Sequence, residues 1–533
     1  MELEESIIVH ALCLNGTDEF EMKLQYRLLL WMLKNVKSDQ ELDQDEFALG
    51  VETVAGNRPV SVSHARELLL RTNCFVIEEG SWKFQKELRV DGRQITQEKL
   101  LDFFGEKKVS QVRDLQMDAK KSAIVRGIQW CIHMVQLAKK DQMKGLPAFL
   151  RCDEEDSLIG KKVAGTATSD ALSLLCSGGE YIKECDIDPA VLADSFDFLV
   201  RQVLECQCLE ENWDKGGFFP LEDQPEAAHP TVDATCLAVM ALCDFYSNRK
   251  VLEEGLDLRF ATGNREVEDA VFSGLDFLFR MQQPGGSYGI YRYMQEYPDG
   301  VTLDAGCVTG IALPNENCTR MAISAMGVSK GSGVFDAREQ YEFYGKCSKC
   351  IGGAYTYLKE HTAIRHGASL WAPYFGDNVG NYPIADVVVS AARVCRSLIP
   401  VWWQCEEERG QIQKYYSDFL VFWMLEEENI KGKNGKYSFK TPGEEKYSVG
   451  TYQWQSYPDM IAAFTVLQGY NRFDIPLRKE EWDFLEKVID RVLEMQHPHG
   501  HWNSPSDPRK PFCAASLAAI ELLKEYRMAK GLL

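Results

Sequence analysis

Four aspartates stand at or near the start of small, apolar segments, where a carboxyl group can do acid–base chemistry. Asp233 lies in the run Thr231-Val232-Asp233-Ala234-Thr235, and no charged residue follows it from Ala234 to Leu242. A carboxyl group in an apolar cavity near other carboxylates keeps its proton toward neutral pH and can act as a general acid. Asp233 is a candidate for such a group. The candidates for lining a cavity around it are Asp170, His229, Thr231, Asp386, Asp459, Tyr291, Trp371, Trp454 and Tyr457.

The same residues also suit a purely structural role. An aspartate in the first turn of a helix accepts hydrogen bonds from free backbone N–H groups and complements the helix dipole. Asp170, Asp386 and Asp459 recur where other apolar segments begin, as capping residues would. The role of the aromatic candidates is also undecided on the sequence alone, because aromatic rings can line a cavity with their π faces, anchor a ligand or fill the core.

A recurring phrase predicts the elements that position these residues. A glycine and an aromatic residue occur together in Gly216-Gly217-Phe218, Gly285-Gly286-Ser287-Tyr288 and Gly500-His501-Trp502. Each turn follows an amphipathic segment that ends near a glutamine, and each precedes a helix of small residues. Self-similarity at long intervals is the signature of stacked helical hairpins. The sequence therefore predicts pairs of an outer amphipathic helix and an inner apolar helix.

Six such pairs can be placed in residues 119–533, after an N-terminal domain and connection in residues 1–118. The first and fourth pairs lack a clear glycine-aromatic turn. The predicted outer helices are 121–139, 190–206, 267–282, 346–360, 415–427 and 482–495, and the inner ones are 169–176, 233–245, 318–327, 386–398, 459–467 and 513–526.

The N-terminal segment predicts a small domain of its own. Helices near 20–37, 43–50 and 65–71 precede a hairpin from Cys74 to Phe84 that turns at Gly80. Three helices followed by a hairpin resemble a winged helix-turn-helix. Acidic and basic residues are nearly balanced here, so phosphate contacts would be weak and a protein-docking role is favoured over DNA binding. The docking candidates for either partner are His64, Arg66, Arg71 and Trp82.

From about residue 119 to residue 526, the helix pairs resemble the α/α toroid of terpenoid cyclases and protein prenyltransferase β-subunits. The resemblance implies a mainly α fold, an (α/α)6 toroid of six outer-inner helix pairs preceded by a small winged-helix-like domain. In class II cyclases the acid is the middle aspartate of Asp-x-Asp-Asp; Asp233 matches it, but Thr231 and Ala234 stand at the other acidic positions. The prenyltransferase zinc site needs an Asp and a Cys two apart and a distant His, and Asp304-Ala305-Gly306-Cys307 has a different spacing. Both catalytic motifs are incomplete.

Other metal-like patterns are weak. Cys347-Ser348-Lys349-Cys350 has no second pair at zinc-finger spacing, and His497-Pro498-His499-Gly500-His501 has no acidic or cysteine partner nearby in the sequence. We expect no metal site and no cofactor. The 17 cysteines, an odd number without a tight framework, favour reduced thiols.

Composition limits the partners. The net charge is -21 over 533 residues, which argues against nucleic acid or an anionic membrane as the main partner. No apolar run reaches the roughly 18 residues that span a bilayer, and the start Met1-Glu2-Leu3-Glu4-Glu5 lacks the basic region of a secretory signal. A cytoplasmic location is expected.

Three functions remain open on the sequence alone. Incomplete catalytic motifs favour a non-catalytic recognition scaffold that binds a protein or peptide partner through the toroid and the docking domain. The first alternative is an isoprenoid cyclase with Asp233 as its general acid. The second is a DNA-binding regulator that acts through residues 20–93.

Overall fold

The computed structural model describes most of the chain in two compact units. Contacts group Met1–Ile124 with Arg478–Pro498, and Val125–Leu477 with His499–Leu533. The residues left undescribed are 1–18, 37–41, 56–59, 71, 73, 79, 86–87, 91–92, 106–108, 148–157, 159–162, 180, 186, 221–228, 291–313, 373–378, 383, 432–455, 498, 505–506, 512 and 532–533.

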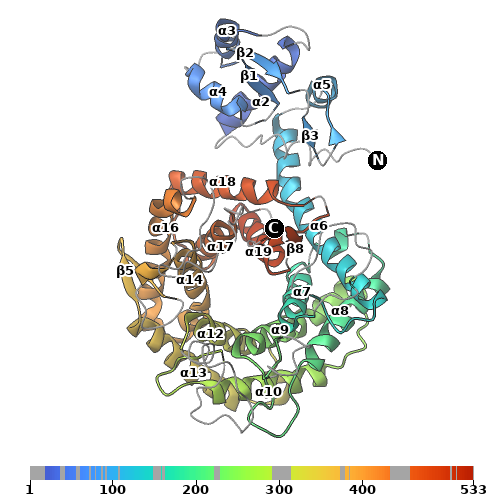
Figure 1. Ribbon diagram of the computed structural model, residues 1–533, viewed down its shortest axis with the longest axis vertical. Helices are drawn as coiled ribbons and strands as arrows, with labels where there is room; N and C mark the ends of the chain where they lie inside the picture. The colour runs from blue at the N-terminus through green and yellow to red at the C-terminus, as the bar shows by residue number, and fades with distance from the viewer. Residues whose placement is uncertain are drawn as a thin grey trace, which may run out of the picture. The chain divides into compact units, whose positions relative to one another are not determined.

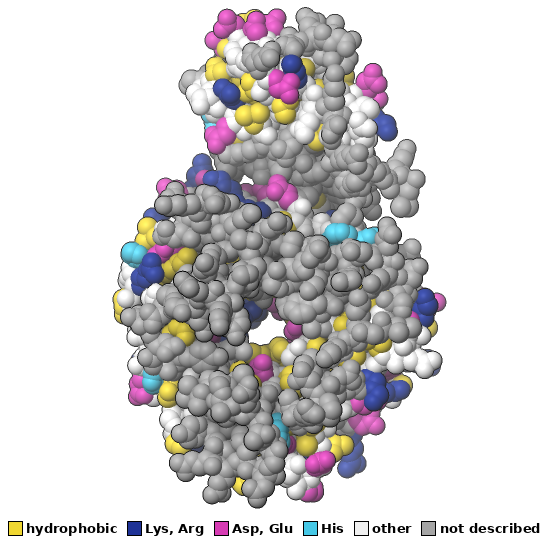
Figure 2. Space-filling model, in the orientation of Figure 1, with side chains coloured by type: hydrophobic (Ala, Val, Ile, Leu, Met, Phe, Trp, Pro, Cys, Tyr) yellow, Lys and Arg dark blue, Asp and Glu magenta, His cyan; other side chains and the backbone are white. Residues whose placement is uncertain are grey.

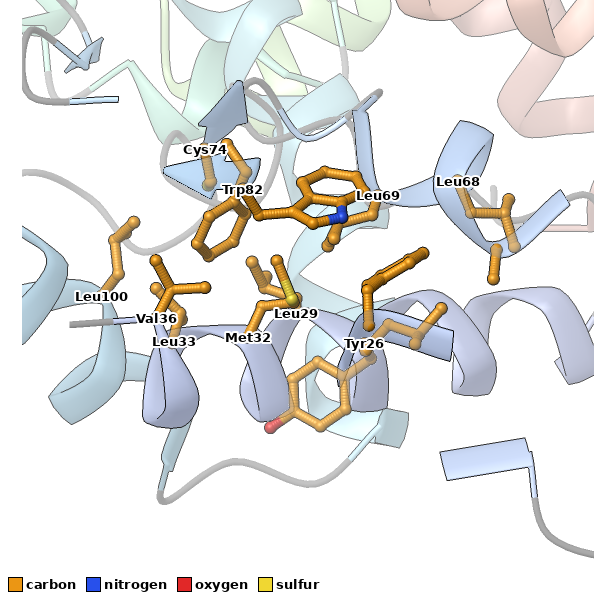
Figure 3. Packing of buried hydrophobic residues seen from close by; sticks show 14 of the residues in the cluster. Tyr26, Leu29, Met32, Leu33, Val36, Leu68, Leu69, Cys74, Trp82 and Leu100 are labelled. Atoms are coloured by element: carbon orange, nitrogen blue, oxygen red, sulfur yellow. The ribbon is translucent and has the colours of Figure 1, made fainter. Parts of the chain in front are cut away.

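The first unit has a core built around helix α2. Figure 3 shows Leu29, Met32 and Leu33 on the face of α2 that points toward Trp82. The Trp82 ring centroid lies 4.6 Å from that of Phe47, and Tyr26 donates a hydrogen bond of 2.6 Å to the carbonyl oxygen of Phe104. The elements are α2 (Glu19–Asn35), α3 (Gln44–Ala55), α4 (Val62–Leu70), β1 (Phe75–Glu78), β2 (Ser81–Phe84), β3 (Arg89–Val90), β4 (Arg93–Gln94), α5 (Gln97–Gly105) and, from later in the chain, α18 (Lys479–Glu494).

Three helices and a hairpin follow one another here in the predicted order, and the hairpin turns at Gly80 with a φ of +85°. The likeness to a winged helix stays a prediction. Trp82 requires a correction, because it is 0% exposed and fills the core instead of presenting a docking surface. On α4, Arg66 is exposed and His64 is half-buried, whereas Arg71 lies outside the described residues.

The second unit is a closed ring of inner helices with outer helices around it (Figure 1). Contacts join α7 to α9, α9 to α12, α12 to α14, α14 to α17, α17 to α19, and α19 back to α7. The outer helices are α6 (Val109–Lys140, which begins in the first unit), α8 (Pro189–Glu205), α10 (Asn264–Met281), α13 (Glu342–Glu360) and α16 (Arg409–Lys431). The inner helices are α7 (Gly165–Ser177), α9 (Val232–Leu256), α12 (Glu316–Gly331), α14 (Ile384–Ser397), α17 (Ser456–Phe473) and α19 (Cys513–Ala529).

With α18 before α19, the chain has six outer-inner pairs, and the predicted mainly α fold with an α/α toroid is confirmed. Short elements fill the connections of the second unit. They are the helix α15 (Ile399–Gln404) and the strands β5 (Ala363–Arg365), β6 (Ala368–Leu370), β7 (Asn503–Ser504) and β8 (Asp507–Pro511), with single 3-10 turns at Ile182–Glu184, Asp336–Arg338, Val379–Asn381 and Glu406–Glu408.

The glutamine and glycine of the repeated phrase tie one outer helix to the next. Gln282, just after α10, donates hydrogen bonds to the carbonyl oxygens of Gly286 (3.1 Å) and Cys350 (2.8 Å), and Cys350 belongs to α13. Gly286 has a φ of +97° and approaches the backbone of Gly353 so closely that a Cβ would overlap it. Only glycine fits there. Gln207 makes the same pair of bonds to the carbonyl oxygens of Gly216 (3.0 Å) and Ala270 (2.9 Å).

A residue one or two positions after the glycine ties the turn to the inner helix. The backbone N–H of Tyr288 donates to Oγ1 of Thr319, one turn into α12, at 3.0 Å. Equivalent bonds join Phe218 to Thr235 (2.9 Å), Trp502 to Ser516 (3.0 Å) and Leu146 to Thr168 (3.0 Å). The first pair therefore has the same connection, with a leucine in place of the aromatic residue.

Among the residues that the structure describes, no helix is both long enough and apolar enough to cross a membrane.

Candidate functional site in the lumen of the ring

The inner helices each present one stripe of half-exposed residues, and we call the space they enclose the lumen. On α9 the stripe is Asp233, Leu237, Met240 and Asp244, and every residue between them is buried. Steps of three and four residues keep a stripe on one helix face. Outer helices and neighbouring inner helices cover the other faces, so the stripes face the lumen. Figure 2 shows an opening there with acidic and basic side chains at its edge.

Four other inner helices repeat this arrangement. Their stripes begin near the helix start and carry most of the charge of the lumen. The residues are Thr166, Asp170, Ser173 and Ser177 on α7; Asn317, Arg320, Ser324 and Val328 on α12; Asp386, Val389, Arg393 and Arg396 on α14; and Ala514, Leu517, Glu521 and Lys524 on α19.

Helix α17 is the exception because an ion pair crosses it. An Nη atom of Arg396 on α14 lies 3.3 Å from a carboxylate oxygen of Glu521 on α19, although α17 stands between these helices in the ring. The Arg396 guanidinium also lies 4.0 Å from the ring centroid of Phe464 on α17. Every α17 side chain from Pro458 to Gly469 is buried. The Arg396–Glu521 ion pair therefore lies on the lumen side of α17.

Asp170 and Asp244, on the neighbouring inner helices α7 and α9, have raised pKa values for the same first cause. Burial raises the pKa of Asp170 to about 7; the negative charge of Glu521 adds to this, and the positive charge of Arg393 opposes it. Burial also raises the pKa of Asp244 to about 7, again with help from Glu521. Ser173 donates a hydrogen bond of 3.2 Å to Asp244, which favours the ionised form. Both carboxyls can exchange a proton near neutral pH.

Neither of these carboxyls caps a helix. Helix α7 begins at Gly165 and α9 at Val232, so Asp170 and Asp244 lie beyond the first turn of their helices. The expectation that Asp170 marks a helix start is therefore wrong, since the helix begins one turn earlier. Asp386 does lie in the first turn of α14, and burial raises its pKa to about 7.

Asp233 is half-buried in the first turn of α9 and binds locally. Its Oδ1 accepts a hydrogen bond of 2.9 Å from the N–H of Ala234, and Oγ1 of Thr231 accepts from the same N–H at 3.3 Å. Thr231 is the N-cap residue of α9. Both residues thus have contacts that support the helix start, while the side chain of Asp233 also belongs to the lumen stripe.

Of the other predicted lining residues, the structure describes His229, Trp371 and Asp459, and none of these lies on a lumen stripe. Nδ1 of His229 lies 2.6 Å from Oδ2 of Asp214, and the buried carboxylate of Asp459 accepts a hydrogen bond of 3.0 Å from the indole of Trp423. Trp371 is 1% exposed and donates to the carbonyl oxygen of Leu358, so it belongs to the core and not to a cavity wall. Tyr291 and Trp454, and the side chain of Tyr457, fall outside the described residues.

Several lumen residues escaped the sequence analysis although a signal for them exists. Asp244, Arg320, Arg393, Arg396 and Glu521 are charged residues that stand among buried, mostly small or apolar residues of the inner helices. Asp233 and Asp244 share a stripe whose steps are four, three and four residues, and that spacing is legible in the sequence. Among the described residues, no group of three or more His, Cys, Asp or Glu could hold a metal ion.

Comparisons with known proteins place the chain near other helical toroids. No family model and no curated protein matches it. Cellobiose 2-epimerase from Bacillus thermoamylovorans is 14% identical, with a TM-score of 0.47 over 72% of this chain and 92% of the epimerase. A D-mannose isomerase is 11% identical, with a TM-score of 0.49 over 78% and 99%. A family 76 glycoside hydrolase (mannosidase) from Bacteroides thetaiotaomicron is 11% identical, with a TM-score of 0.44 over 76% and 98%.

These three structures are carbohydrate-processing enzymes. The predicted function, a non-catalytic recognition scaffold, is corrected on this finding, since these neighbours are an epimerase, an isomerase and a mannosidase. The incomplete motifs that led to the scaffold belonged to particular families and said nothing of other chemistry in the same fold. At these identities the likeness concerns the fold, so the chemistry has to come from the residues of the lumen.

Proposed function

We propose that the chain is an enzyme that binds a carbohydrate in the lumen and transfers protons with the carboxyl groups of Asp170 and Asp244. One observation carries the proposal: these two carboxyls and Glu521 lie on the lumen stripes of α7, α9 and α19, whereas the side chains between the stripe positions of these helices are buried. Charged groups are costly to hold inside a fold unless they are paired or used.

The composition of the stripes suits a sugar. Ser173, Glu521 and Arg396 offer hydroxyl, carboxylate and guanidinium groups to the hydroxyls at the edge of a sugar ring. Leu237 and Met240 offer apolar surface to the C–H groups on its faces. Binding sites for small molecules combine apolar walls with a few placed polar groups in this way.

The proton chemistry follows from the acidity of the two carboxyls. With a pKa of about 7, each of Asp170 and Asp244 is protonated in part of the molecules at neutral pH. General acid–base catalysis is most efficient when the pKa of the catalytic group lies near the working pH. The protonated carboxyl donates its proton to a substrate oxygen, and the ionised carboxyl accepts a proton from a substrate hydroxyl, C–H group or water. The net proton count is unchanged.

Turnover by the purified full-length chain tests the proposal. The protein is incubated with a panel of mono- and oligosaccharides around neutral pH, and the products are separated by chromatography. Asp170→Asn and Asp244→Asn should each lower kcat by about 10²- to 10⁴-fold. Asp276→Asn is the matched control, since burial also raises the pKa of this carboxyl but it lies on the outer helix α10. Full activity in both lumen variants, or no turnover of any sugar by the wild type, contradicts the proposal.

A further inference from the structure

Three arginines lie on the lumen stripes of two neighbouring inner helices. Arg320 comes from α12, and Arg393 and Arg396 come from α14; all three are half-buried, and the two helices are in contact. Moving a guanidinium group out of water is unfavourable unless anionic groups surround it. The carboxylates near each arginine therefore show how far the chain's own residues balance these positive charges.

Arg396 has a partner, whereas the pairing of Arg320 is imperfect. Arg396 pairs with Glu521 across α17. Nε of Arg320 lies 2.8 Å from Oε1 of Glu316 and both atoms are buried, but the pair lacks the geometry of a hydrogen bond and neither atom has another hydrogen-bond partner among the described residues. Glu316 thus balances the charge of Arg320 without satisfying its directional hydrogen-bonding capacity, which is costly in a buried pair.

Two further positive charges act on Arg320. Burial is the first cause that lowers its pKa to about 10; the negative charge of Glu316 opposes this, and the smaller effects of Arg393 and Arg396 add to it. An arginine in water stays protonated well above that value. The three guanidinium groups are therefore close enough to raise one another's electrostatic energy, and a bound anion would lower it.

We infer that Arg320 and Arg393 form a subsite for an oxyanion group on the substrate, namely a carboxylate, a sulfate ester or a phosphate ester carried by a sugar. Planar guanidinium groups bind such oxyanions through two parallel hydrogen bonds. The charge of Arg393 also acts on Asp170, so an anion held by this subsite brings the attached sugar near the proposed catalytic carboxyl. The sugar part rests on the proposed function; the anion part does not.

Binding of inorganic sulfate and inorganic phosphate to the full chain tests the subsite. Calorimetry is done with chloride holding the ionic strength constant, because surface charges respond to salt. The wild type should bind both anions, and Arg320→Gln and Arg393→Gln should bind them about tenfold more weakly or not at all. Arg320→Lys should fall between, since an ammonium keeps the charge but cannot make two parallel bonds. Arg265→Gln, an exposed arginine on α10, is the control.

A second set of ligands identifies the group. Glucuronate, glucose 6-sulfate and glucose 6-phosphate are compared with glucose, and the best of the three names the oxyanion. A wild type that binds no anion, or glutamine variants that bind as tightly as the wild type, overturns the inference. If Arg320→Gln does not fold, Arg320→Lys and Arg393→Lys decide in its place. Anion binding without sugar turnover refutes the proposed function alone, and turnover without anion preference refutes the subsite alone.

Discussion

At the scale of single residues, burial sets the acidity of the lumen carboxyls and neighbouring charge adjusts it. Burial is the first cause of the raised pKa in Asp170, Asp244 and Asp386, and for Asp386 it is the only one. A group held this way is poised for proton transfer, but it also destabilises the fold whenever it ionises.

Asp244→Asn should therefore change stability in a pH-dependent way. The folded pKa is about 7 against an ordinary value of 3.8, so the native state holds a proton that the unfolded state has released. The stability that this proton contributes is present at low pH and is lost as the pH rises through about 7. An amide never ionises. Relative to the wild type, the free energy of unfolding of the variant should rise by on the order of 2–4 kcal/mol as the pH increases from below 3.8 to above about 7.

Thermal melts of both proteins across the pH range measure this gain, and the comparison of the two proteins cancels the titration of all other groups. A difference in melting temperature that stays constant with pH means that Asp244 titrates normally.

The sequence predicted lumen residues only where a charged residue stands at or near the start of an apolar run. Asp170 and Asp386 were found because each begins or nearly begins an apolar run. Asp244, Arg320 and Arg393 were missed because they lie further inside helices, and their common direction depends on how the ring closes. Closure is a long-range property that local periodicity does not contain.

At the scale of elements, the glutamine-glycine turn is the joint between successive helix pairs, and its stability can be tested at Gly286. An alanine there would have to adopt a φ of +97° and would place its Cβ against the backbone of Gly353. Gly286→Ala should lower the free energy of unfolding by about 2 kcal/mol or more. Gly285→Ala is the matched control, since this neighbouring glycine has an ordinary φ and would meet only the edge of Tyr357. Denaturant titration measures both, and equal losses contradict the joint.

The hydroxyl of Thr319, which accepts the hydrogen bond from the backbone N–H of Tyr288, gives a second test of the same connection. Thr319→Val keeps the shape of the side chain but leaves the buried N–H of Tyr288 without its acceptor, at a cost of about 1–3 kcal/mol. Thr319→Ser keeps the acceptor and should lose much less. Equal losses in the two variants, measured by denaturant titration, would show that the methyl group and not the hydrogen bond matters.

The sequence could predict these joints only in part. Three turns were visible because glycine and an aromatic residue stand together. The first pair makes the same hydrogen bond through Leu146 and Thr168, and leucine carries no such signal. The physical requirement is a backbone N–H, which every residue except proline supplies.

At the scale of the whole ring, the sequence repeat predicted the helix pairs. Which charged side chains meet in the lumen depends instead on how the inner helices close into a ring. Contact between α19 and α7 closes the inner circle, and the pair of Arg396 with Glu521 then spans α17. The fold does not choose the chemistry, because one architecture hosts unrelated activities. That is why incomplete motifs from a resembled family led to the wrong function.

The ion pair that crosses α17 offers a test of this arrangement in both stability and catalysis. Arg396 and Glu521 are each 27% exposed, so a double-mutant cycle with glutamine at both positions should give a coupling of roughly 1 kcal/mol. The exposed pair of Arg409 and Glu406, at 3.7 Å, is the control and should give almost none.

Glu521→Gln should also shift the pH profile of the lumen carboxyls. The negative charge of Glu521 raises the pKa of Asp170 and of Asp244, so its removal lowers both values and moves the acidic limb of the kcat profile to lower pH. Glu406→Gln leaves that limb in place, because it removes a carboxylate from the exposed control pair. A profile that does not move in Glu521→Gln, although the double-mutant cycle shows coupling, would separate the ion pair from the proton chemistry and place the catalytic carboxyls elsewhere in the ring.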